Sequence, residues 1–277
     1  MRGGLAARTL LRRQPALLLG VVLAALMLYV AALPGTLTVH SPTAVDVNAA
    51  LQPPSVAHLF GTDDTGRDLY ARVLYGARIT LGIVAGSLAL AAVAGGALGL
   101  LAGFFGRVSD MAASRLVDVA LSFPPIFLGV VITGILGPGV RNLVLAMAIV
   151  YAPVFFRIAR AGAIAEGART YIEAARALGL GEWTILRRHV ARNVWPLIFL
   201  QYMILFPLAL QIEAALGFLG LGVQPPTPDW GSILAQAKDL LLTAPWMSIF
   251  PGAFILIAAA AVILIGRSLQ PILDAPG

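Results

Sequence analysis

The sequence contains no cysteine and few charged residues, and both absences limit what the protein can be. Without thiols it has no disulfides, no thiolate metal sites and no cysteine nucleophile. Only 12% of the 277 residues are charged, whereas 59% are hydrophobic and the mean hydropathy is +0.90. A soluble domain of this length would carry many more charges on its surface. We therefore expect an all-α, polytopic membrane protein.

Lysine is almost absent as well, since the only one is Lys238, which follows Ala237. The phosphate-binding loop of an ATPase needs Gly, four residues and then Gly-Lys-Ser/Thr, because the lysine must reach the terminal phosphates. The chain therefore cannot supply the ATPase motor, and any ATP and Mg²⁺ are expected on partner subunits. No acid, base or nucleophile cluster is recognisable, so we expect neither catalytic residues nor a cofactor in this chain.

The three histidines, His40, His58 and His189, are too scattered to predict a metal site. A net charge of +6 and a pI near 10.3 are compatible with nucleic-acid binding, but the basic residues do not interleave with aromatic residues in one patch. Instead, most of the basic residues fall in segments that lie on one side of the expected membrane spans. The expected surroundings are a lipid bilayer, with no nucleic acid.

Six apolar runs organise the chain. A helix rises about 1.5 Å per residue, so about 20 apolar residues cross a hydrocarbon core of ~30 Å. In a six-span layout fourteen of the 19 basic residues lie on one side, which the positive-inside rule assigns to the cytoplasm together with both termini. The expected spans are about 16–33, 79–104, 119–136, 143–158, 195–221 and 247–265.

The segments between the spans follow from this layout. A cleavable signal peptide is the alternative for 16–33. The run is longer than the apolar region of a signal peptide, which usually has ~7–15 residues, and Ala31-Ala32-Leu33-Pro34 is a poor cleavage site. The expected segments are a cytoplasmic N-terminus 1–15, a first span 16–33, an external segment 34–78, a core 79–266 with a cytoplasmic loop 159–194 and an external loop 223–245, and a cytoplasmic tail 267–277.

The cytoplasmic loop 159–194 has a helical pattern. Apolar residues recur at three- and four-residue spacing from Ala161 to Leu178, which predicts one face of a single helix. Gly179 and Gly181 are expected to end it, because glycine readily adopts the left-handed conformation of a last turn. The polar residues on the opposite face are Glu166, Arg169, Glu173 and Arg176.

Within this loop, Glu-Ala-Ala followed by three residues and a glycine resembles the EAA loop of bacterial ABC-importer permeases. In that family the loop shapes a coupling helix that docks into a cleft on the ATPase subunit. Small residues let a partner approach the helix backbone, and a glutamate can set the register through charge pairs. The alternative is an ordinary loop whose arginines only fix topology. The resemblance assigns ATPase coupling to Glu173, Ala174, Ala175, Leu178 and Gly179.

The external segment contains Gly-Thr-Asp-Asp-Thr-Gly-Arg-Asp at 61–68. We expect a turn that leads into a helix capped by Asp63 or Thr65. Leu69, Val73 and Leu74 would lie on an apolar face along the membrane surface. With the following Tyr-Gly-Ala-Arg, the stretch resembles the GTDxxGRD…YGAR signature of dipeptide, oligopeptide and nickel importers. The signature residues are Gly61, Asp63, Gly66, Arg67, Asp68 and, in the second external loop, Trp230.

The fifth span contains Gln201, Gln211 and Glu213. A carboxylate within a span is costly, which makes it a functional hypothesis by default. Two alternatives stay open: Glu213 lies in a translocation path or gate with Gln211 and Gly217, or it accepts hydrogen bonds at a loosened helix end. The proline-rich stretch that follows resembles the family sequence GLGVQPPTPxWG, with Trp230 expected as an interfacial anchor.

The four resembling stretches cover almost all of 58–246, in the family's order. They imply the type I ABC-importer permease fold in a bacterial inner membrane, specifically that of the shorter permease subunit. The implied partners are a second, related permease, two cytoplasmic ATPases and an extracytoplasmic solute-binding protein. The solute is left open among dipeptides, oligopeptides, nickel chelates and glutathione. A secondary transporter is the rival class, but it would need more intramembrane carboxylates or matched repeats.

One position departs from the family pattern. The family loop usually continues to Pro-Asn before the fifth span, whereas this chain has Arg192-Asn193. Without the proline, the second segment of the loop is expected to run into the span as continuous helix. Pro196 is the alternative point for a break.

Overall fold

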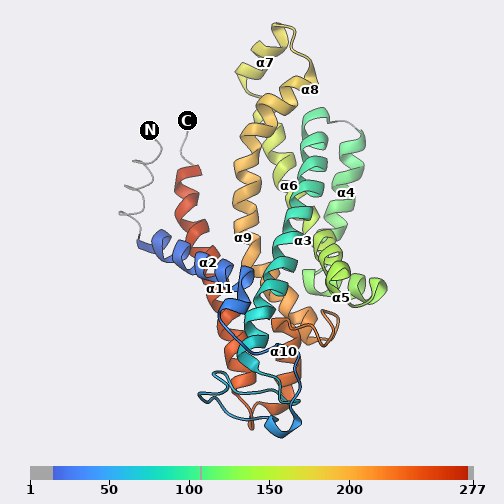
Figure 1. Ribbon diagram of the computed structural model, residues 1–277. Coiled ribbons are helices and arrows are strands. Elements are labelled where there is room, and N and C mark those ends of the chain that lie inside the picture. Colours follow the sequence, from blue (N-terminus) through green and yellow to red (C-terminus); the bar gives the residue numbers. More distant parts are fainter. Residues whose placement is uncertain (1–14, 107, 274–277) are drawn as a thin grey trace.

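The computed structural model describes residues 15–106 and 108–273, and these residues form an all-helical bundle (Figure 1). Most of the expected N-terminal segment, Arg107 and the end of the tail lie outside the described residues. The helices are α2 (Pro15–Ala32), η1 (Pro34–Thr36), η2 (Val47–Ala49), α3 (Leu69–Phe105), α4 (Val108–Ser122), α5 (Pro125–Leu136), α6 (Val140–Gly167), α7 (Thr170–Ala177), α8 (Glu182–Ile185), the π-helical turn η3 (Leu186–Val190), α9 (Ala191–Phe218), α10 (Trp230–Ala237), η4 (Lys238–Leu240) and α11 (Trp246–Leu273).

Five stretches of helix in the described part are long and apolar enough to cross a membrane. They contain α2, α3, α6, the run from α8 through α9, and α11. A sixth crossing is formed if α4 and α5 count together, although this pair is bent by 99°. The all-α fold with up to six spans agrees with the expectation from the sequence.

The third expected span differs from the structure. The expected bounds of about 119–136 leave Asp110 and Asp118 in the connection before the span, but both lie inside α4, which packs along α6. Arg160 of α6 donates to Asp110 through Nε and Nη2 at 2.5 and 2.6 Å, and Arg157 contacts Asp118 at 3.2 Å. These ion pairs neutralise the charged side chains where α4 packs along α6. The sharp bend occurs because Pro124 has no N–H for the helix to continue.

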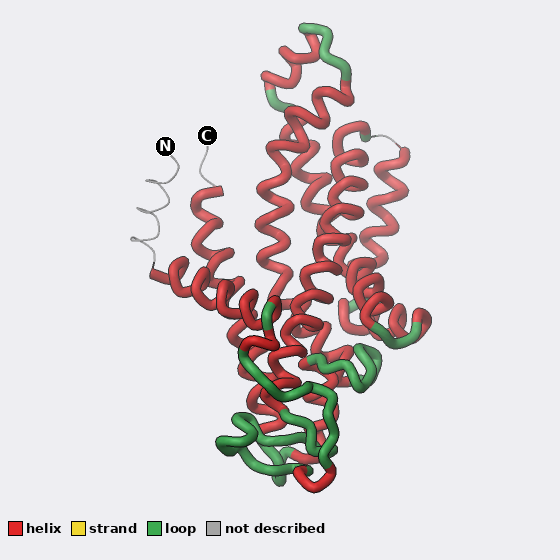
Figure 2. Tube along the Cα trace, in the orientation of Figure 1, coloured by secondary structure: helices red, strands yellow, loops and turns green. Residues whose placement is uncertain are grey.

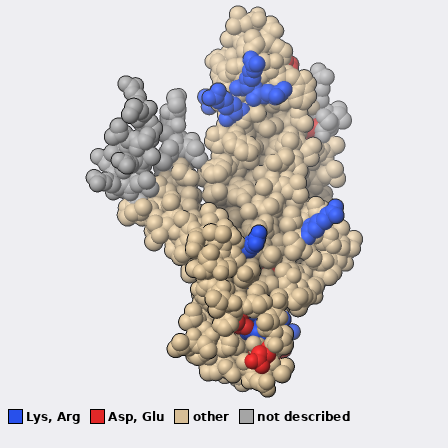
Figure 3. Space-filling model, in the orientation of Figure 1, with Lys and Arg blue, Asp and Glu red and all other residues tan. Residues whose placement is uncertain are grey.

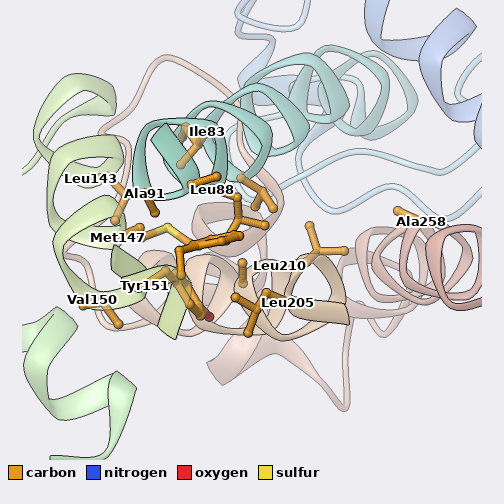
Figure 4. Close-up of a cluster of buried hydrophobic side chains, with 14 of the residues drawn as sticks. Ile83, Leu88, Ala91, Leu143, Met147, Val150, Tyr151, Leu205, Leu210 and Ala258 are labelled. Carbon is orange, nitrogen blue, oxygen red and sulfur yellow. The ribbon is translucent and has the colours of Figure 1, made fainter. Parts of the chain in front are cut away.

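The pairing of α3 with α6 is the most extensive in the bundle. Gly95, Gly99 and Gly103 face α6 so closely that a methyl group at each position would overlap a backbone carbonyl oxygen there. Small residues permit such an approach where helix association depends on packing. This glycine stripe therefore allows α3 to pack closely on α6. Figure 4 shows the apolar layer beside it, where Leu88 of α3 and Met147 of α6 meet Leu210 of α9.

Helix α3 begins earlier than expected, at Leu69, so the expected boundary at 78/79 falls inside it. Leu69, Val73 and Leu74 are buried in the core. The prediction of a separate helix along the membrane surface is wrong, because these apolar side chains pack against other parts of the same chain. The helix extends beyond the apolar run into the loop layer of the protein.

The connections gather at two opposite ends of the bundle (Figure 2). One end consists of α7 and α8, and we call it the α7 end. The other contains the long segment between α2 and α3, the chain between α9 and α11, and helix α10, and we call it the α10 end. The Glu-Ala-Ala segment lies at the α7 end, and the Gly61–Asp68 stretch and Trp230 both lie at the α10 end.

Candidate functional site

Helix α7 at the α7 end turns one face inward and the other to solvent. Ile172 is fully buried and Ala175 nearly so, whereas Glu173 and Ala174 are exposed. The single face predicted from Ala161 to Leu178 is wrong, because α6 ends at Gly167 and the chain turns before α7 begins. The break leaves the Glu-Ala-Ala segment as a separate short helix.

A closed turn follows α7. Gly179 has a φ of +81°, and its N–H donates to the carbonyl of Arg176 at 2.9 Å. The N–H of Leu180 donates to the carbonyl of Ala175 at 3.1 Å, as in a glycine-terminated helix. Arg176 also donates to Glu182 through Nε and Nη2 at 2.9 and 3.2 Å, and these hydrogen bonds raise the pKa of Arg176. The predicted stop at Gly179 is confirmed, whereas Gly181 is the N-cap residue of α8 instead of ending α7.

Apolar and basic side chains are exposed around this turn. Leu178 is 81% exposed and Trp183 is 60% exposed, although both are large and hydrophobic. Basic residues gather at this end, while the middle of the face seen in Figure 3 carries only isolated charges. A cavity of about 790 Å³ is lined by Arg187, Arg188, His189, Arg192 and Asn193.

Glu166 at the end of α6 holds the α7 end together. Its carboxylate accepts hydrogen bonds from the hydroxyl of Tyr171 and from Asn193 Nδ2 at 2.6 Å, and it pairs with Arg169 Nε at 3.1 Å. These partners come from α7, from the start of α9 and from the intervening turn. The sequence pattern placed Glu166 on a polar face but gave no sign of this positioning role.

The second segment of the loop runs directly into the fifth span. Helix α8 continues through η3 into α9 without a non-helical residue. This agrees with the expectation for Arg192 in place of the family proline. The alternative break at Pro196 is wrong, since Pro196 lies within α9, where a single missing N–H is tolerated.

At the α10 end, the Gly61–Asp68 stretch folds around the carboxylate of Asp63. This buried carboxylate accepts hydrogen bonds from the backbone and hydroxyl of Thr65 at 2.9 and 2.8 Å, and from Arg67 Nε at 2.7 Å. Arg72, which is also buried, reaches it at 3.3 Å from α3. The helix cap was predicted at Asp63 or Thr65, but Asp68 caps α3 by accepting from Ala71 N–H at 2.7 Å.

Two glycines of this signature are required by geometry. Gly61 and Gly66 both have a φ of +76°, which side-chain-bearing residues rarely adopt. A methyl group at Gly66 would also overlap the backbone oxygen of Asp46, and one at Gly61 would lie 2.5 Å from the oxygen of Gln52. The loop therefore packs directly on the segment that precedes it.

Trp230 begins α10 and does not anchor the protein at a membrane interface. The side chain is fully buried, and its indole N–H donates to the carbonyl of Val73 in α3 at 2.9 Å. Its backbone N–H donates to Thr80 Oγ1 at 3.2 Å. The stretch that contains Trp230 thus packs on the helix that follows the Gly61–Asp68 stretch. The sequence of each loop taken separately does not predict this contact. Gln236 of α10 adds polar contacts to Arg67 and Arg72.

The two polar residues at the end of the fifth span lie on different sides of α9. Gln211 is exposed, whereas Glu213 is fully buried. Neither carboxylate oxygen of Glu213 has hydrogen-bond geometry with a described residue, and its polar neighbours are Asp229 and Thr80. Gly217 packs on the backbone of Gly231 in α10, because a Cβ atom added at Gly217 would lie 2.9 Å from the Cα atom of Gly231.

The segment between α2 and α3 brings two histidines together. The ring centres of His40 and His58 are 5.3 Å apart, and His58 Nδ1 lies 2.8 Å from Asp68 Oδ2. Two of the three histidines, which looked scattered in the sequence, therefore lie close together in the fold. His189 lies in η3 at the opposite end.

A helical bundle with several apolar spans, a compact loop helix at one end and an interlocked loop layer at the other is the architecture of a multi-pass membrane protein. The profile of the family described as "Binding-protein-dependent transport system inner membrane component" matches residues 95–275. The chain belongs to this family. It is thus an inner-membrane permease subunit of an ABC importer and is not itself an ATPase, since partner ATPases bind the ATP and the family carries no cofactor.

Similar proteins support this assignment over nearly the full chain. The dipeptide transport system permease protein DppC of Alkalihalophilus pseudofirmus is 37% identical, over 95% of this chain and 87% of its own length. The probable D,D-dipeptide transport system permease protein DdpC of Escherichia coli is also 37% identical, over 96% and 89%. The glutathione transport system permease protein GsiD of Pectobacterium atrosepticum is 36% identical, over 80% and 73%.

Proposed function

We propose that this permease takes part in the import of dipeptides or oligopeptides. The similarity to permeases named for dipeptide transport extends over nearly the whole chain, whereas the similarity to a glutathione permease covers less of it. Glutathione is the second candidate, because it is a small peptide-like solute. Nickel chelates are the third candidate solute, and only the resemblance of the 61–78 signature supports them.

The α7 end is the proposed docking site for an ATPase subunit. The observation that carries this proposal is the exposure of Glu173 and Ala174 on α7 and of Leu178 directly after it. The burial of Ile172 and the hydrogen bonds of Glu166 hold this short helix against the bundle. Exposed small and apolar residues on a rigid element suit a cleft in a partner protein. The basic residues of η3 and Arg192 would attract an acidic rim around such a cleft.

The sidedness follows from this assignment. The α7 end, both termini and the tail would lie in the cytoplasm, as the distribution of basic residues predicts. The α10 end, with the Gly61–Asp68 loop and Trp230, would then face outward. Its interlocked loops offer a rigid surface for a solute-binding protein.

The complete transporter would contain a second, related permease, two ATPases and an extracytoplasmic binding protein. The translocation path would lie between the two permeases. Gln211 is exposed on α9 and would face this path, whereas the buried Glu213 and Gly217 would support a gate from behind. This arrangement assigns different roles to neighbouring polar residues of one helix.

Leu178→Glu tests the docking site in the assembled transporter. The added charge should enter the ATPase cleft and reduce solute-stimulated ATP hydrolysis by about tenfold or more, a loss of at least ~1.4 kcal/mol in coupling. Complex yield with the second permease should not change, because the side chain is 81% exposed in this chain.

Leu242→Glu is the matched control, since Leu242 is fully exposed at the opposite end. It should leave ATP hydrolysis coupled to the solute in detergent-solubilised complexes that are saturated with binding protein. Normal coupling in Leu178→Glu would contradict the proposed docking site. Uptake assays with labelled dipeptide, glutathione and a nickel–histidine chelate in cells with the cognate binding protein then identify the solute.

A further inference from the structure

The α10 end contains a group of metal-ligating side chains that the transport function does not explain. His40, His58 and Asp68 each offer one ligand atom, and these three atoms all lie within 4.8 Å of one another. His40 and His58 come from the segment after α2, and Asp68 is the cap of α3. The fold therefore brings together three ligands that are separated by about 18 and 10 residues in the sequence.

Hydrogen bonds with the backbone hold Asp68 and His58 in place. Asp68 is almost fully buried, and its Oδ1 accepts from the N–H of Ala71, which leaves Oδ2 facing His58. The carbonyl of His58 accepts from the N–H groups of Ser55 and Gly61, both at 2.8 Å. Two of the three ligands are thus fixed before an ion arrives.

The third ligand, His40, lies on the solvent-exposed side of the group. His40 is exposed, and its backbone N–H donates to Thr38 Oγ1 at 3.1 Å. A cavity of about 290 Å³ is lined by both His40 and Asp68, so water has access to the group. Water molecules could complete a coordination shell that the protein leaves open.

The chemistry of the three ligands selects a class of ion. Imidazole nitrogens suit zinc, nickel and copper, and a carboxylate is compatible with all three, whereas calcium and magnesium prefer oxygen ligands alone. Bonds of about 2.0–2.1 Å at tetrahedral angles separate neighbouring ligand atoms by about 3.3 Å. The separation of 2.8 Å between His58 Nδ1 and Asp68 Oδ2 widens by only a small movement to admit an ion.

We propose that His40, His58 and Asp68 bind one divalent transition-metal ion of the Zn²⁺ type. The ion takes one nitrogen from each imidazole and Oδ2 from Asp68, while Oδ1 keeps its hydrogen bond to α3. Binding cross-links the segment after α2 to the first turn of α3. The ion thereby stiffens the surface proposed to meet the binding protein.

The experiment uses the full-length chain, purified through a tag without histidine and placed in lipid nanodiscs. Zinc binding is measured by calorimetry and by metal analysis after desalting. The wild type should retain one zinc ion per chain, and zinc should raise its Tm, because a ligand that binds only the folded state stabilises it. His40→Ala and His58→Ala should each weaken binding by about tenfold or more and abolish the shift in Tm.

His189→Ala is the matched control, because it removes the only other histidine, at the opposite end of the bundle. It should bind zinc like the wild type. The Tm of His40→Ala without zinc should equal that of the wild type, which separates loss of a ligand from loss of the fold. Absence of retained zinc in the wild type, or equal affinity in all four proteins, would overturn the proposal and leave only the His58–Asp68 hydrogen bond.

Discussion

Glu213 combines complete burial with a chemical group that water normally solvates. Its carboxyl group lies beside Asp229, which already accepts hydrogen bonds from Thr80, Gly231 N–H and Ser232 N–H. Two neighbouring carboxylates in a buried place repel each other. The residue is thus surrounded by protein in this conformation, which favours a supporting role over direct contact with the solute.

Substitutions at Glu213 separate the two roles. Glu213→Gln should keep both complex yield and solute uptake near wild-type levels, because the amide retains the shape and an acceptor oxygen and removes the repulsion with Asp229. Glu213→Leu should lower the yield, since the bulkier branched side chain does not fit this fully buried site and overpacking costs about 1–3 kcal/mol. Yield is measured by size-exclusion chromatography and uptake with labelled solute. Normal yield with abolished uptake in Glu213→Gln would place the charge in the path.

At the scale of the element, α3 shows how glycine positions decide the packing of the bundle. A methyl group at Gly99 would overlap the backbone of Phe156 in α6. A methyl group at Gly86 on the same helix would meet no side chain and no other element of the described chain within 4 Å. Both positions are helical, so propensity alone predicts the same effect of alanine at each. The surroundings predict opposite effects.

Gly99→Ala should destabilise the permease by about 1–3 kcal/mol, because the new methyl group forces α3 and α6 apart. Gly86→Ala should be neutral or stabilising by up to about 1 kcal/mol, because alanine loses less backbone entropy in a helix. Thermal unfolding of the two purified variants in the same detergent measures both effects. Equal stability of the two variants would mean that α3 and α6 are not in close contact.

For the whole molecule, the opposite placement of the α7 and α10 ends makes topology directly testable. The chain has no cysteine, so a single introduced thiol reports its own side of the membrane. Leu242 is fully exposed at the α10 end, so the thiol of Leu242→Cys should react with a membrane-impermeant reagent in intact spheroplasts. Leu178→Cys, at the α7 end, should react only after permeabilisation. The reverse pattern would show that the protein is inserted the other way round.

The sequence by itself determined the class of the protein and most of its helices. Long apolar runs must be helical in lipid because every backbone polar group needs a partner within its own segment. The stop at Gly179 and the helical continuation past Arg192 were also predictable, since both depend on local backbone chemistry.

Only the tertiary structure decided where the polar signature residues lie. Asp63, Trp230 and Glu213 are buried because α3, α9 and α10 pack on one another, and the sequence of each loop alone is equally compatible with exposure. The same packing brings His40 and His58 to Asp68 at the cap of α3. Contacts between residues far apart in the chain depend on how the whole bundle closes, so local patterns could not determine them.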